Sequence, residues 1–205
     1  MSFFSQLTEK PWLTSRSRAA DLPEGSVYPL PAPTIAVRLI LTVATVVFVL
    51  FIVAYGDRLA LSDWRPLAEP SILWANTIIL ILSSAAWHWA TVSARRGRID
   101  GVKTGLLAGG GLAIVFLIGQ FLAWRQLEAA GYYADANPAN AFFYLLTAVH
   151  AVHLLGGLVA WGRTASKVLR GAELAKVRLS VELCAVYWHF LLVVWLVLFA
   201  LLSFT

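Results

Sequence analysis

Three histidines and one carboxylate are the residues of this sequence whose types and spacing could support chemistry inside an apolar environment. His150 and His153 lie three residues apart in the apolar stretch 137–162, so they share one face of a helix. His189 and Glu182 are seven residues apart in the last apolar stretch, and this spacing of two turns also puts them on one face. Imidazole binds copper, zinc and iron, and a buried carboxylate can relay a proton. A metal site and a proton path are therefore the two chemistries to weigh.

The spacing of these residues favours a structural role over a metal site. A membrane haem takes an axial histidine from each of two facing helices, and His150 and His153 are too close together on one helix to serve two haems. Di-iron membrane hydroxylases need more ligands than four histidines provide. We interpret His150, His153, His189 and Glu182 as a polar core whose members hydrogen-bond across helices, with a metal site as the alternative. Glu182 lies near the end of its helix, where a carboxylate more often binds a neighbour or a lipid headgroup than carries protons.

The elements that position these residues are segments long enough to cross a bilayer. Of the 205 residues 60% are hydrophobic and 13% are charged, and the mean hydropathy is +0.75, values typical of an integral membrane protein. A span of about 20 apolar residues crosses the hydrocarbon as a helix. The sequence predicts an all-α fold with five transmembrane helices, over residues 34–55, 71–93, 101–124, 138–162 and 179–203. The polar, proline-rich residues 1–33 are predicted to form an extended N-terminal arm on the cytoplasmic surface or against a partner.

Depth along the predicted helices brings three of the histidines to one level. Counted from Pro138, His150 lies about 18 Å into the membrane, and His189 lies about 15 Å in from the opposite side. The connection between these two helices is short, which favours neighbouring positions. We therefore expect His150, His153 and His189 to lie near the midplane, where they could meet. His88 is expected in the membrane interface, since it lies near the end of its helix.

The basic residues indicate the orientation of the chain. Most Lys and Arg residues fall on one side of the five predicted helices, and the other side holds only Arg58, Arg65 and Arg125. This asymmetry places the N-terminus in the cytoplasm and the C-terminus outside. The formal charge of +5 comes from short clusters between apolar runs, so we do not expect nucleic-acid binding. The single cysteine, Cys184, allows neither a disulfide framework nor a cysteine metal site.

Small residues in the third predicted helix indicate close helix packing. Gly101, Gly105 and Gly109 recur every four residues. They form a smooth surface that another helix can approach closely, to which we expect Gly110, Gly111 and Gly119 to add. We favour this packing face over a ligand groove. A phosphate-binding loop is excluded because these glycines lie within an apolar helix.

Several blocks of residues resemble a known family. The last helix carries Glu182, then YWHF at 187–190 and VVW at 193–195, and the helix before it carries His150-x-x-His153 followed by Gly156-Gly157. These blocks resemble the last two helices of subunit III of the haem-copper oxidases, in the short five-helix form found in bacteria. Further matches to that family are Phe142-Phe143, Asn76-Thr77, Ser83-Ser84 and Phe116-x-x-x-Gln120.

The resemblance implies a V-shaped helix bundle that is an accessory subunit of a terminal oxidase. Haem and copper are then expected in the partner catalytic subunit I, with none in this chain, and subunit II is a second expected partner. The complex would reduce O2 to water in the bacterial inner membrane. This chain would stabilise the catalytic subunit, hold phospholipids and support proton uptake without being catalytic itself. The implied lipid-binding residues are Glu182, Trp188, His189 and Arg178.

The sequence departs from the family pattern at positions that often carry carboxylates. Leu192 stands where many members have an aspartate, and Ala123 stands where they have a glutamate. The first predicted helix reads TVATVV at 42–47, so it lacks the buried carboxylate of many relatives. These departures argue against a direct share in proton conduction and leave the structural role intact.

Two other functions stay open at this point. One is an accessory subunit of a nitric oxide reductase, which the residues do not separate from an oxidase subunit. The other is a free-standing metal-binding or transport protein that uses the midplane histidines. Transport is disfavoured because corresponding broken helices and internal repeats are not visible. The electron donor of the complex, cytochrome c or quinol, is likewise open, as is the haem type.

Overall fold

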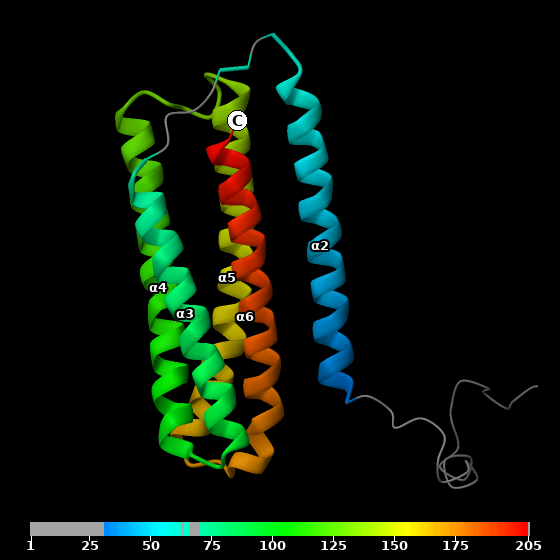
Figure 1. Ribbon diagram of the computed structural model, residues 1–205, viewed down its shortest axis with the longest axis vertical. Coiled ribbons are helices and arrows are strands. Elements are labelled where there is room, and N and C mark those ends of the chain that lie inside the picture. Colours follow the sequence, from blue (N-terminus) through cyan, green and yellow to red (C-terminus); the bar gives the residue numbers. More distant parts are fainter. Residues whose placement is uncertain (1–30, 63, 66–69, 205) are drawn as a thin grey trace, which may run out of the picture. The chain divides into compact units, whose positions relative to one another are not determined.

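Five long α-helices make up the part of the chain that the computed structural model describes, residues 31–62, 64–65 and 70–204 (Figure 1). They are α2 (Ala32–Leu59), α3 (Ile72–Arg95), α4 (Ile99–Ala129), α5 (Pro138–Leu169) and α6 (Leu174–Ser203). All five are long and apolar enough to cross a membrane. A helix suits that environment because it satisfies its backbone hydrogen bonds internally. The predicted all-α fold with five transmembrane helices is confirmed.

Two parts of the sequence-based picture stay predictions. The V shape implied by the family resemblance is one of them. The other is the N-terminal arm, which lies almost entirely outside the described residues, since these begin at residue 31.

The helices run past the ends of the apolar windows from which they were predicted. α5 continues through Arg163 and Lys167 to Leu169, and α6 already begins at Leu174. Hydropathy marks the thickness of the hydrocarbon, whereas helical hydrogen bonding continues into the interface. There long basic side chains keep their stems on apolar surface and their charges in water.

Local sequence signals set the helix ends. The Asn137 side chain accepts a hydrogen bond from the Ala139 amide at 3.3 Å, and Pro138 occupies the first turn, which lacks partners for its amides. Three other ends carry a glycine with positive φ just past the helix. After α3, Gly97 has φ +72° and the Arg98 amide reaches back to the Ser93 carbonyl at 2.9 Å. The same arrangement recurs at Gly131 and Gly171, because glycine adopts this conformation without steric cost.

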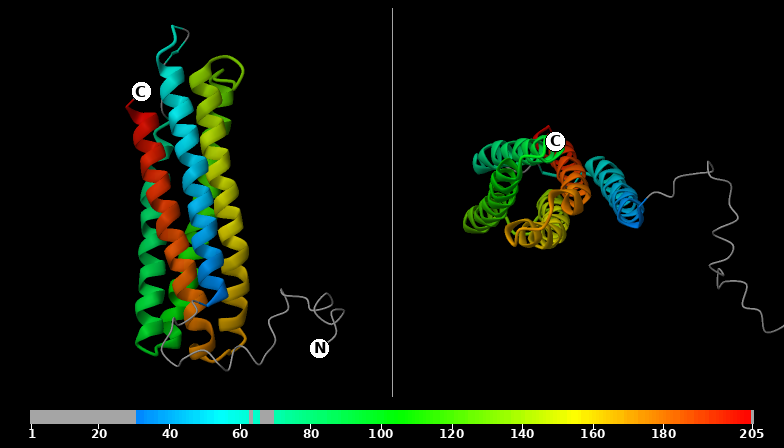
Figure 2. Two further views of the ribbon diagram at one scale, coloured as in Figure 1. Left: turned by 90° about the vertical axis from the view of Figure 1, so that its right-hand side faces the viewer. Right: turned by 90° about the horizontal axis from the view of Figure 1, so that it is seen from below.

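Helices α3 and α4 are neighbours in a bundle that also contains α5 and α6, here called the four-helix bundle (Figure 2). The glycine face predicted on α4 lies against α3. A Cβ at Gly105 would come within 2.8 Å of the Ala86 carbonyl oxygen, and one at Gly109 would meet the Trp87 indole. Polar groups add to this contact, since the Ser83 hydroxyl donates to the Gly109 carbonyl at 2.7 Å. The glycines of α4 thus leave backbone exposed, and side chains of α3 pack directly against it.

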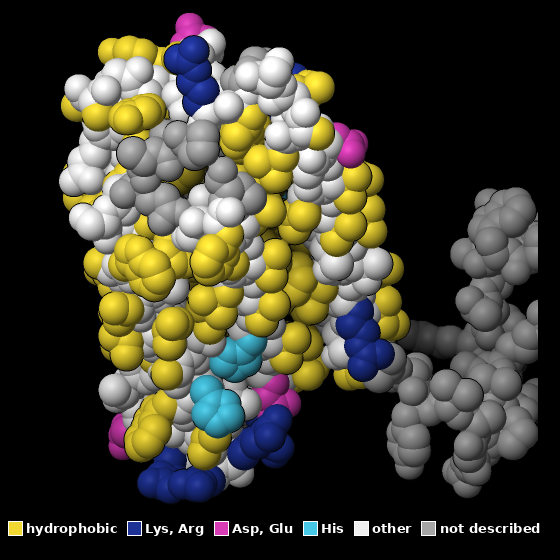
Figure 3. All heavy atoms as spheres, turned by 45° about the horizontal axis from the view of Figure 1, so that its top comes forward, with side chains coloured by type: hydrophobic (Ala, Val, Ile, Leu, Met, Phe, Trp, Pro, Cys, Tyr) yellow, Lys and Arg dark blue, Asp and Glu magenta, His cyan; other side chains and the backbone are white. Residues whose placement is uncertain are grey.

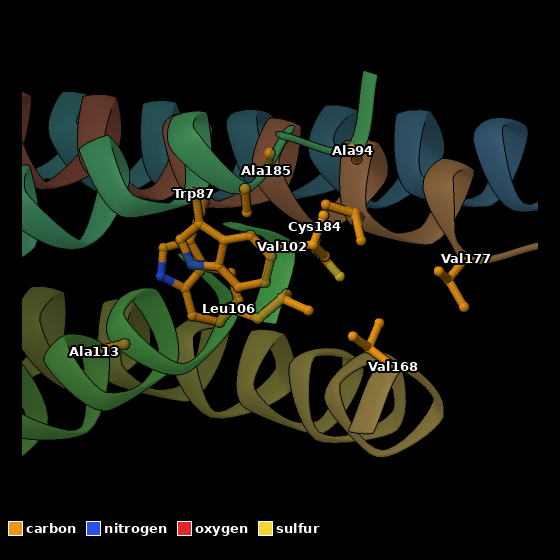
Figure 4. Packing of buried hydrophobic residues seen from close by; sticks show 12 residues of the cluster. Trp87, Ala94, Val102, Leu106, Ala113, Val168, Val177, Cys184 and Ala185 are labelled. Atoms are coloured by element: carbon orange, nitrogen blue, oxygen red, sulfur yellow. The ribbon is translucent and has the colours of Figure 1, made fainter. Parts of the chain in front are cut away.

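Trp87 is the largest residue of one apolar cluster in the four-helix bundle (Figure 4). Its indole is fully buried, and around it the figure shows Val102 and Leu106 from α4 with Cys184 and Ala185 from α6. Large rings therefore fill the spaces between helices whose own facing residues are small.

Helix α2 lies beside α6 and contacts the four-helix bundle through large side chains (Figure 2). Phe48 and Tyr55 are buried in a cluster with Leu146 of α5 and Leu198 of α6. Beside this cluster an apolar groove of about 190 Å³ runs between α2 and α6, lined by Thr45, Phe48, Val49, Ile52, Phe190, Val193, Val194, Val197 and Leu198. This groove is called the α2–α6 groove below.

A candidate polar core in the helix bundle

The four histidines lie in two pairs, each with its own neighbours. His150 and His153 of α5 both lie near Phe48 of α2, with ring centroids at 6.3 and 5.2 Å. His189 of α6 lies next to His88 of α3, with ring centroids at 6.2 Å. The structure therefore brings His150 together with His153, but it pairs His189 with His88 instead of with them.

His150 is the fully buried member of the set, with 0% of its surface exposed. Aromatic rings surround it: the centroid of Trp195 is 5.3 Å away and that of Phe116 is 5.9 Å away. Among the described residues neither of its ring nitrogens has a hydrogen-bond partner. The predicted cross-helix hydrogen bond of His150 is therefore not made to another protein group.

His153 is satisfied within its own helix. Its Nδ1 donates to the Val149 carbonyl at 2.8 Å, so the imidazole lies along the α5 backbone. The Tyr187 hydroxyl of α6 donates to the carbonyl of His153 at 3.0 Å and ties the two helices together. The cross-helix hydrogen bond at this position thus comes from the tyrosine of the YWHF block.

His189 makes the cross-helix hydrogen bond that was expected of a structural histidine. Its Nδ1 is 2.5 Å from the Ser84 hydroxyl of α3. His88, on the same helix as Ser84, is exposed on the surface next to it. Figure 3 shows imidazoles on the molecular surface close to acidic and basic side chains.

Glu182 lies in an ion-pair cluster at the end of the bundle. Its Oε1 is 3.1 Å from Nε of Arg95 on α3 and 3.3 Å from Nε of Arg178 one turn earlier on α6. The side chain of Glu182 is 26% exposed, and those of Arg95 and Arg178 are 61% and 52% exposed. The cluster is therefore a partly solvated clamp between the end of α3 and the start of α6.

Trp188 does not belong with the residues expected to meet lipid. It is 1% exposed, and its ring lies 5.0 Å from that of Trp87 in the centre of the bundle. A Cβ at Gly157 of α5 would come within 2.7 Å of the Trp188 ring, which shows how closely α5 approaches. Trp188 therefore packs between helices, and the expectation that it binds lipid was wrong.

From the sequence, Asn76, Thr77 and Gln120 were identified only as matches to the family, and a gathering of buried polar residues near His150 was not predicted. The Trp195 indole donates to the Thr77 hydroxyl at 2.9 Å, and the Trp124 indole donates to the Thr147 hydroxyl at 3.0 Å. Asn76 is also buried, at 1% exposed. The signal available was the presence of Asn and Thr inside apolar runs, because a polar side chain buried there needs a hydrogen-bond partner.

Within the described residues, His, Cys, Asp and Glu nowhere form a group of three that could hold a metal ion. The polar groups instead join helices in pairs, or they lie buried and neutral. This arrangement can fix helix packing and bind neutral or zwitterionic polar groups, and it offers no set of metal ligands among these residues.

Comparison with known proteins gives one consistent result. Residues 56–204 match the family described as cytochrome c oxidase subunit III. A probable cytochrome c oxidase subunit 3 from Mycobacterium leprae is 29% identical over 148 residues, which cover 69% of this chain and 71% of that protein. The cytochrome c oxidase subunit 3 of Thermostichus vulcanus is 31% identical over 128 residues, 62% of each chain. A heme-copper oxidase subunit I+III from Aeropyrum pernix is 30% identical over 127 residues, which cover 62% of this chain and 16% of that protein.

Proposed function

Because this chain belongs to the cytochrome c oxidase subunit III family, we propose that it is an accessory subunit of a haem-copper terminal oxidase that reduces O2 to water. The observation that carries the proposal is the family match over residues 56–204, which contains the whole four-helix bundle. The matched segment spans 62–71% of the two subunit 3 relatives named above. In this proposal the oxidase activity belongs to the assembled complex.

This chain contributes no redox centre of its own in the proposed function. Two facts support this view: the histidines are divided between two separate pairs, and His153 and His189 are already hydrogen-bonded to protein groups. Haem and copper then lie in the catalytic subunit. The role of this chain is to stabilise that subunit and to keep its lipid surroundings in place, which supports proton uptake.

The expected partners are subunits I and II, of which subunit I has the more direct support. The Aeropyrum pernix relative carries subunits I and III under one name, and this chain matches 16% of that protein. We infer that the present chain packs against a separate subunit I, as the subunit I and subunit III parts of such a fused polypeptide would pack against each other. Exposed apolar residues on the outer faces of α4 and α5, such as Ile118, Val152 and Val159, supply surface for such contacts.

Lipid binding is proposed at the surface where α3 ends and α6 begins. Arg95 and Arg178 leave much of their guanidinium surface exposed beside Glu182, and His189 lies further along the same face of α6. Basic side chains at the membrane interface attract phosphate headgroups. The α2–α6 groove has an apolar lining and would suit an acyl chain.

The proposed location is the bacterial inner membrane, with the N-terminus in the cytoplasm and the C-terminus outside. The basic residues at the end of α3, the end of α5 and the start of α6 support this orientation, since positive charge favours the cytoplasmic side.

Purification after mild detergent extraction tests the proposed function. The tagged chain should co-purify with a larger subunit, and the preparation should show haem absorbance and contain copper. The same chain expressed by itself should bind less than stoichiometric haem or copper. A chain that binds a chromophore stoichiometrically on its own, and loses it when His150→Ala is introduced, would instead establish a free-standing metal protein.

The identity of the co-purified catalytic subunit decides a second question. An oxidase subunit should consume O2 when given reduced cytochrome c or quinol. A partner that reduces nitric oxide and not O2 would replace the oxidase assignment with a nitric oxide reductase.

A further inference from the structure

One level of the four-helix bundle carries a buried polar side chain from every helix. These residues are Asn76 and Thr77 of α3, Gln120 of α4, His150 of α5 and Trp195 of α6, and we call this set the polar layer. The exposed fractions of Asn76, Gln120 and His150 are 1%, 2% and 0%. The layer is thus closed to lipid and to water outside the bundle.

Contacts between α3 and α4 place Asn76 at the level of Gln120. A Cβ at Gly119 would collide with the Asn76 side-chain amide, so the amide lies directly against the bare α4 backbone at that point. Gln120 is the next residue on α4. The missing side chain at Gly119 leaves room at this level for the polar groups of Asn76 and Gln120.

Contacts between α4 and α5 place Gln120 at the level of His150. Phe116 and Trp124 lie one turn before and one turn after Gln120, on the same face of α4. The Phe116 ring contacts His150 at 5.9 Å, and the Trp124 indole donates to Thr147, one turn from His150. Because the two helices run in opposite directions, Gln120 lies between these two contacts.

Trp195 closes the layer from α6. Its ring centroid is 5.3 Å from that of His150 and 4.9 Å from that of Phe116. Its indole N–H donates to Thr77, and the Thr77 hydroxyl donates to the Leu73 carbonyl at 2.8 Å. The donors of Thr77 and Trp195 are therefore satisfied by protein groups.

Five buried atoms of the polar layer have no protein partner among the described residues. They are Nδ2 of Asn76, Nε2 and Oε1 of Gln120, and Nδ1 and Nε2 of His150. A buried polar group without a hydrogen bond costs roughly 1–3 kcal/mol, so these five atoms at one level of the bundle need partners that the described protein groups do not supply. Buried water meets this need in proteins, where it typically makes about three hydrogen bonds to groups of this kind.

We propose that the polar layer is an internal water site, in which ordered water bridges Asn76, Gln120 and His150. The two amide nitrogens donate to water, and the Gln120 carbonyl accepts from it. A neutral imidazole supplies one further donor and one further acceptor. Water both donates and accepts, so it matches this mixed, uncharged set. The site goes beyond the accessory role proposed above and does not depend on it.

Solid-state NMR on the full chain in lipid bilayers tests this proposal with every residue of the polar layer unaltered. With histidine labelled by ¹⁵N and leucine by ¹³C, magnetisation that starts on water should reach the His150 ring nitrogens at short mixing times. It should not reach the side chain of Leu154, which is fully buried one turn further along α5. The signals of His88, His153 and His189 are assigned by His→Gln variants, so that His150 is also identified by elimination.

A variant and its control show whether the water is held by the polar layer. Gln120→Leu removes both unpartnered atoms of α4, and the transfer from water to His150 should fall to the level seen at Leu154. Thr164→Val is the matched control, because Thr164 is buried on α5 but donates to the Ala160 carbonyl. The water signal at His150 should be unchanged in this control.

Three results would overturn the proposal. The first is an absence of transfer from water to His150 in the unaltered chain. The second is a direct coupling between the His150 ring and the Gln120 amide, which would show that the two side chains satisfy each other. The third is equal transfer to Leu154, which would mean that water enters the bundle without a specific site.

Discussion

Glu182 lies between two guanidinium groups that come from different helices. How much these ion pairs contribute to stability depends on how exposed they are to water. The pair with Arg178 lies within α6, whereas the pair with Arg95 joins α6 to α3. Exposed ion pairs contribute little because water screens them and the side chains lose entropy. The cluster is half-exposed, so a modest contribution to stability is expected.

Replacing the carboxylate tests that expectation. Glu182→Gln should lower the free energy of unfolding by about 1 kcal/mol or less, since both guanidinium groups lose their charged partner. Thermal unfolding in detergent at low and high salt measures the effect, and the loss should shrink as salt is added. Glu173→Gln is the control, because among the described residues Glu173 pairs with the exposed Lys176 alone, 3.1 Å away, and should change stability less. A larger loss in the control would contradict this ranking.

Trp195 offers a second test at a single residue. Trp195→Phe keeps an aromatic ring beside His150 but removes the indole donor to Thr77. We expect a loss of about 1 kcal/mol from the hydrogen bond, together with a contribution from the smaller ring. Trp74→Phe is the control, since Trp74 is 60% exposed and rests on Phe199 at 4.8 Å. Equal unfolding midpoints for the two variants would show that the hydrogen bond to Thr77 adds nothing.

The sequence identified His150, His153, His189 and Glu182 as polar residues of the membrane region, but not how they group. Their spacing gives depth along each helix, and depth alone suggested that three histidines could meet. The direction in which a side chain points around its helix depends on packing between helices. His189 faces Ser84 of α3, because the rotation of α6 is set by contacts such as that of Trp188 with α3 and α5.

At the scale of helices, small residues decide how closely two backbones approach. The glycine face on α4 was predicted from its spacing, and the structure confirms it at Gly101, Gly105 and Gly109. The prediction was wrong for Gly111, because a Cβ there would meet nothing within 4 Å. Gly110 and Gly119 do lie against other helices, so a four-residue spacing alone does not tell packing glycines from a glycine that merely neighbours them.

These two kinds of glycine give a matched pair of variants. Gly105→Ala places a methyl group against the Ala86 carbonyl and Ala90, and should destabilise the protein by about 1–3 kcal/mol. Gly111→Ala should be neutral or stabilise by up to about 1 kcal/mol, since alanine favours the helix. Unfolding of both variants in SDS–detergent mixtures measures the difference. A destabilisation of the same size in both would refute the close approach of α3 to α4.

Helix presence followed from the apolar runs, but helix ends did not. The charged residues from Arg163 onward looked like a loop, whereas α5 continues to Leu169. Glycines just past α3, α4 and α5 carried the better signal, because each adopts positive φ where the helix stops. Hydropathy indicates whether a segment lies in hydrocarbon or in water. Capping residues indicate where the backbone hydrogen bonds of the helix end.

For the whole molecule, the orientation in the membrane is the prediction open to the most direct test. In a Cys184→Ala background, Ala134→Cys places a thiol in the connection between α4 and α5, and Ala175→Cys places one at the start of α6. Both positions are exposed. A membrane-impermeant maleimide added to intact cells should label position 134 and spare position 175, and lysis should make both reactive. The reverse pattern would invert the topology drawn from the basic residues.

The connection between α3 and α4 is only three residues long, and the two helices it joins fit together backbone to backbone. Two such spans can leave the insertion machinery as one hairpin, with their mutual contacts formed before α5 has been synthesised. Early pairing would hide Asn76 and Gln120 from acyl chains while the rest of the chain is still being made. The first contacts between helices would then form in the middle of the polypeptide. The later helices α5 and α6 would pack against a pair of helices that is already formed.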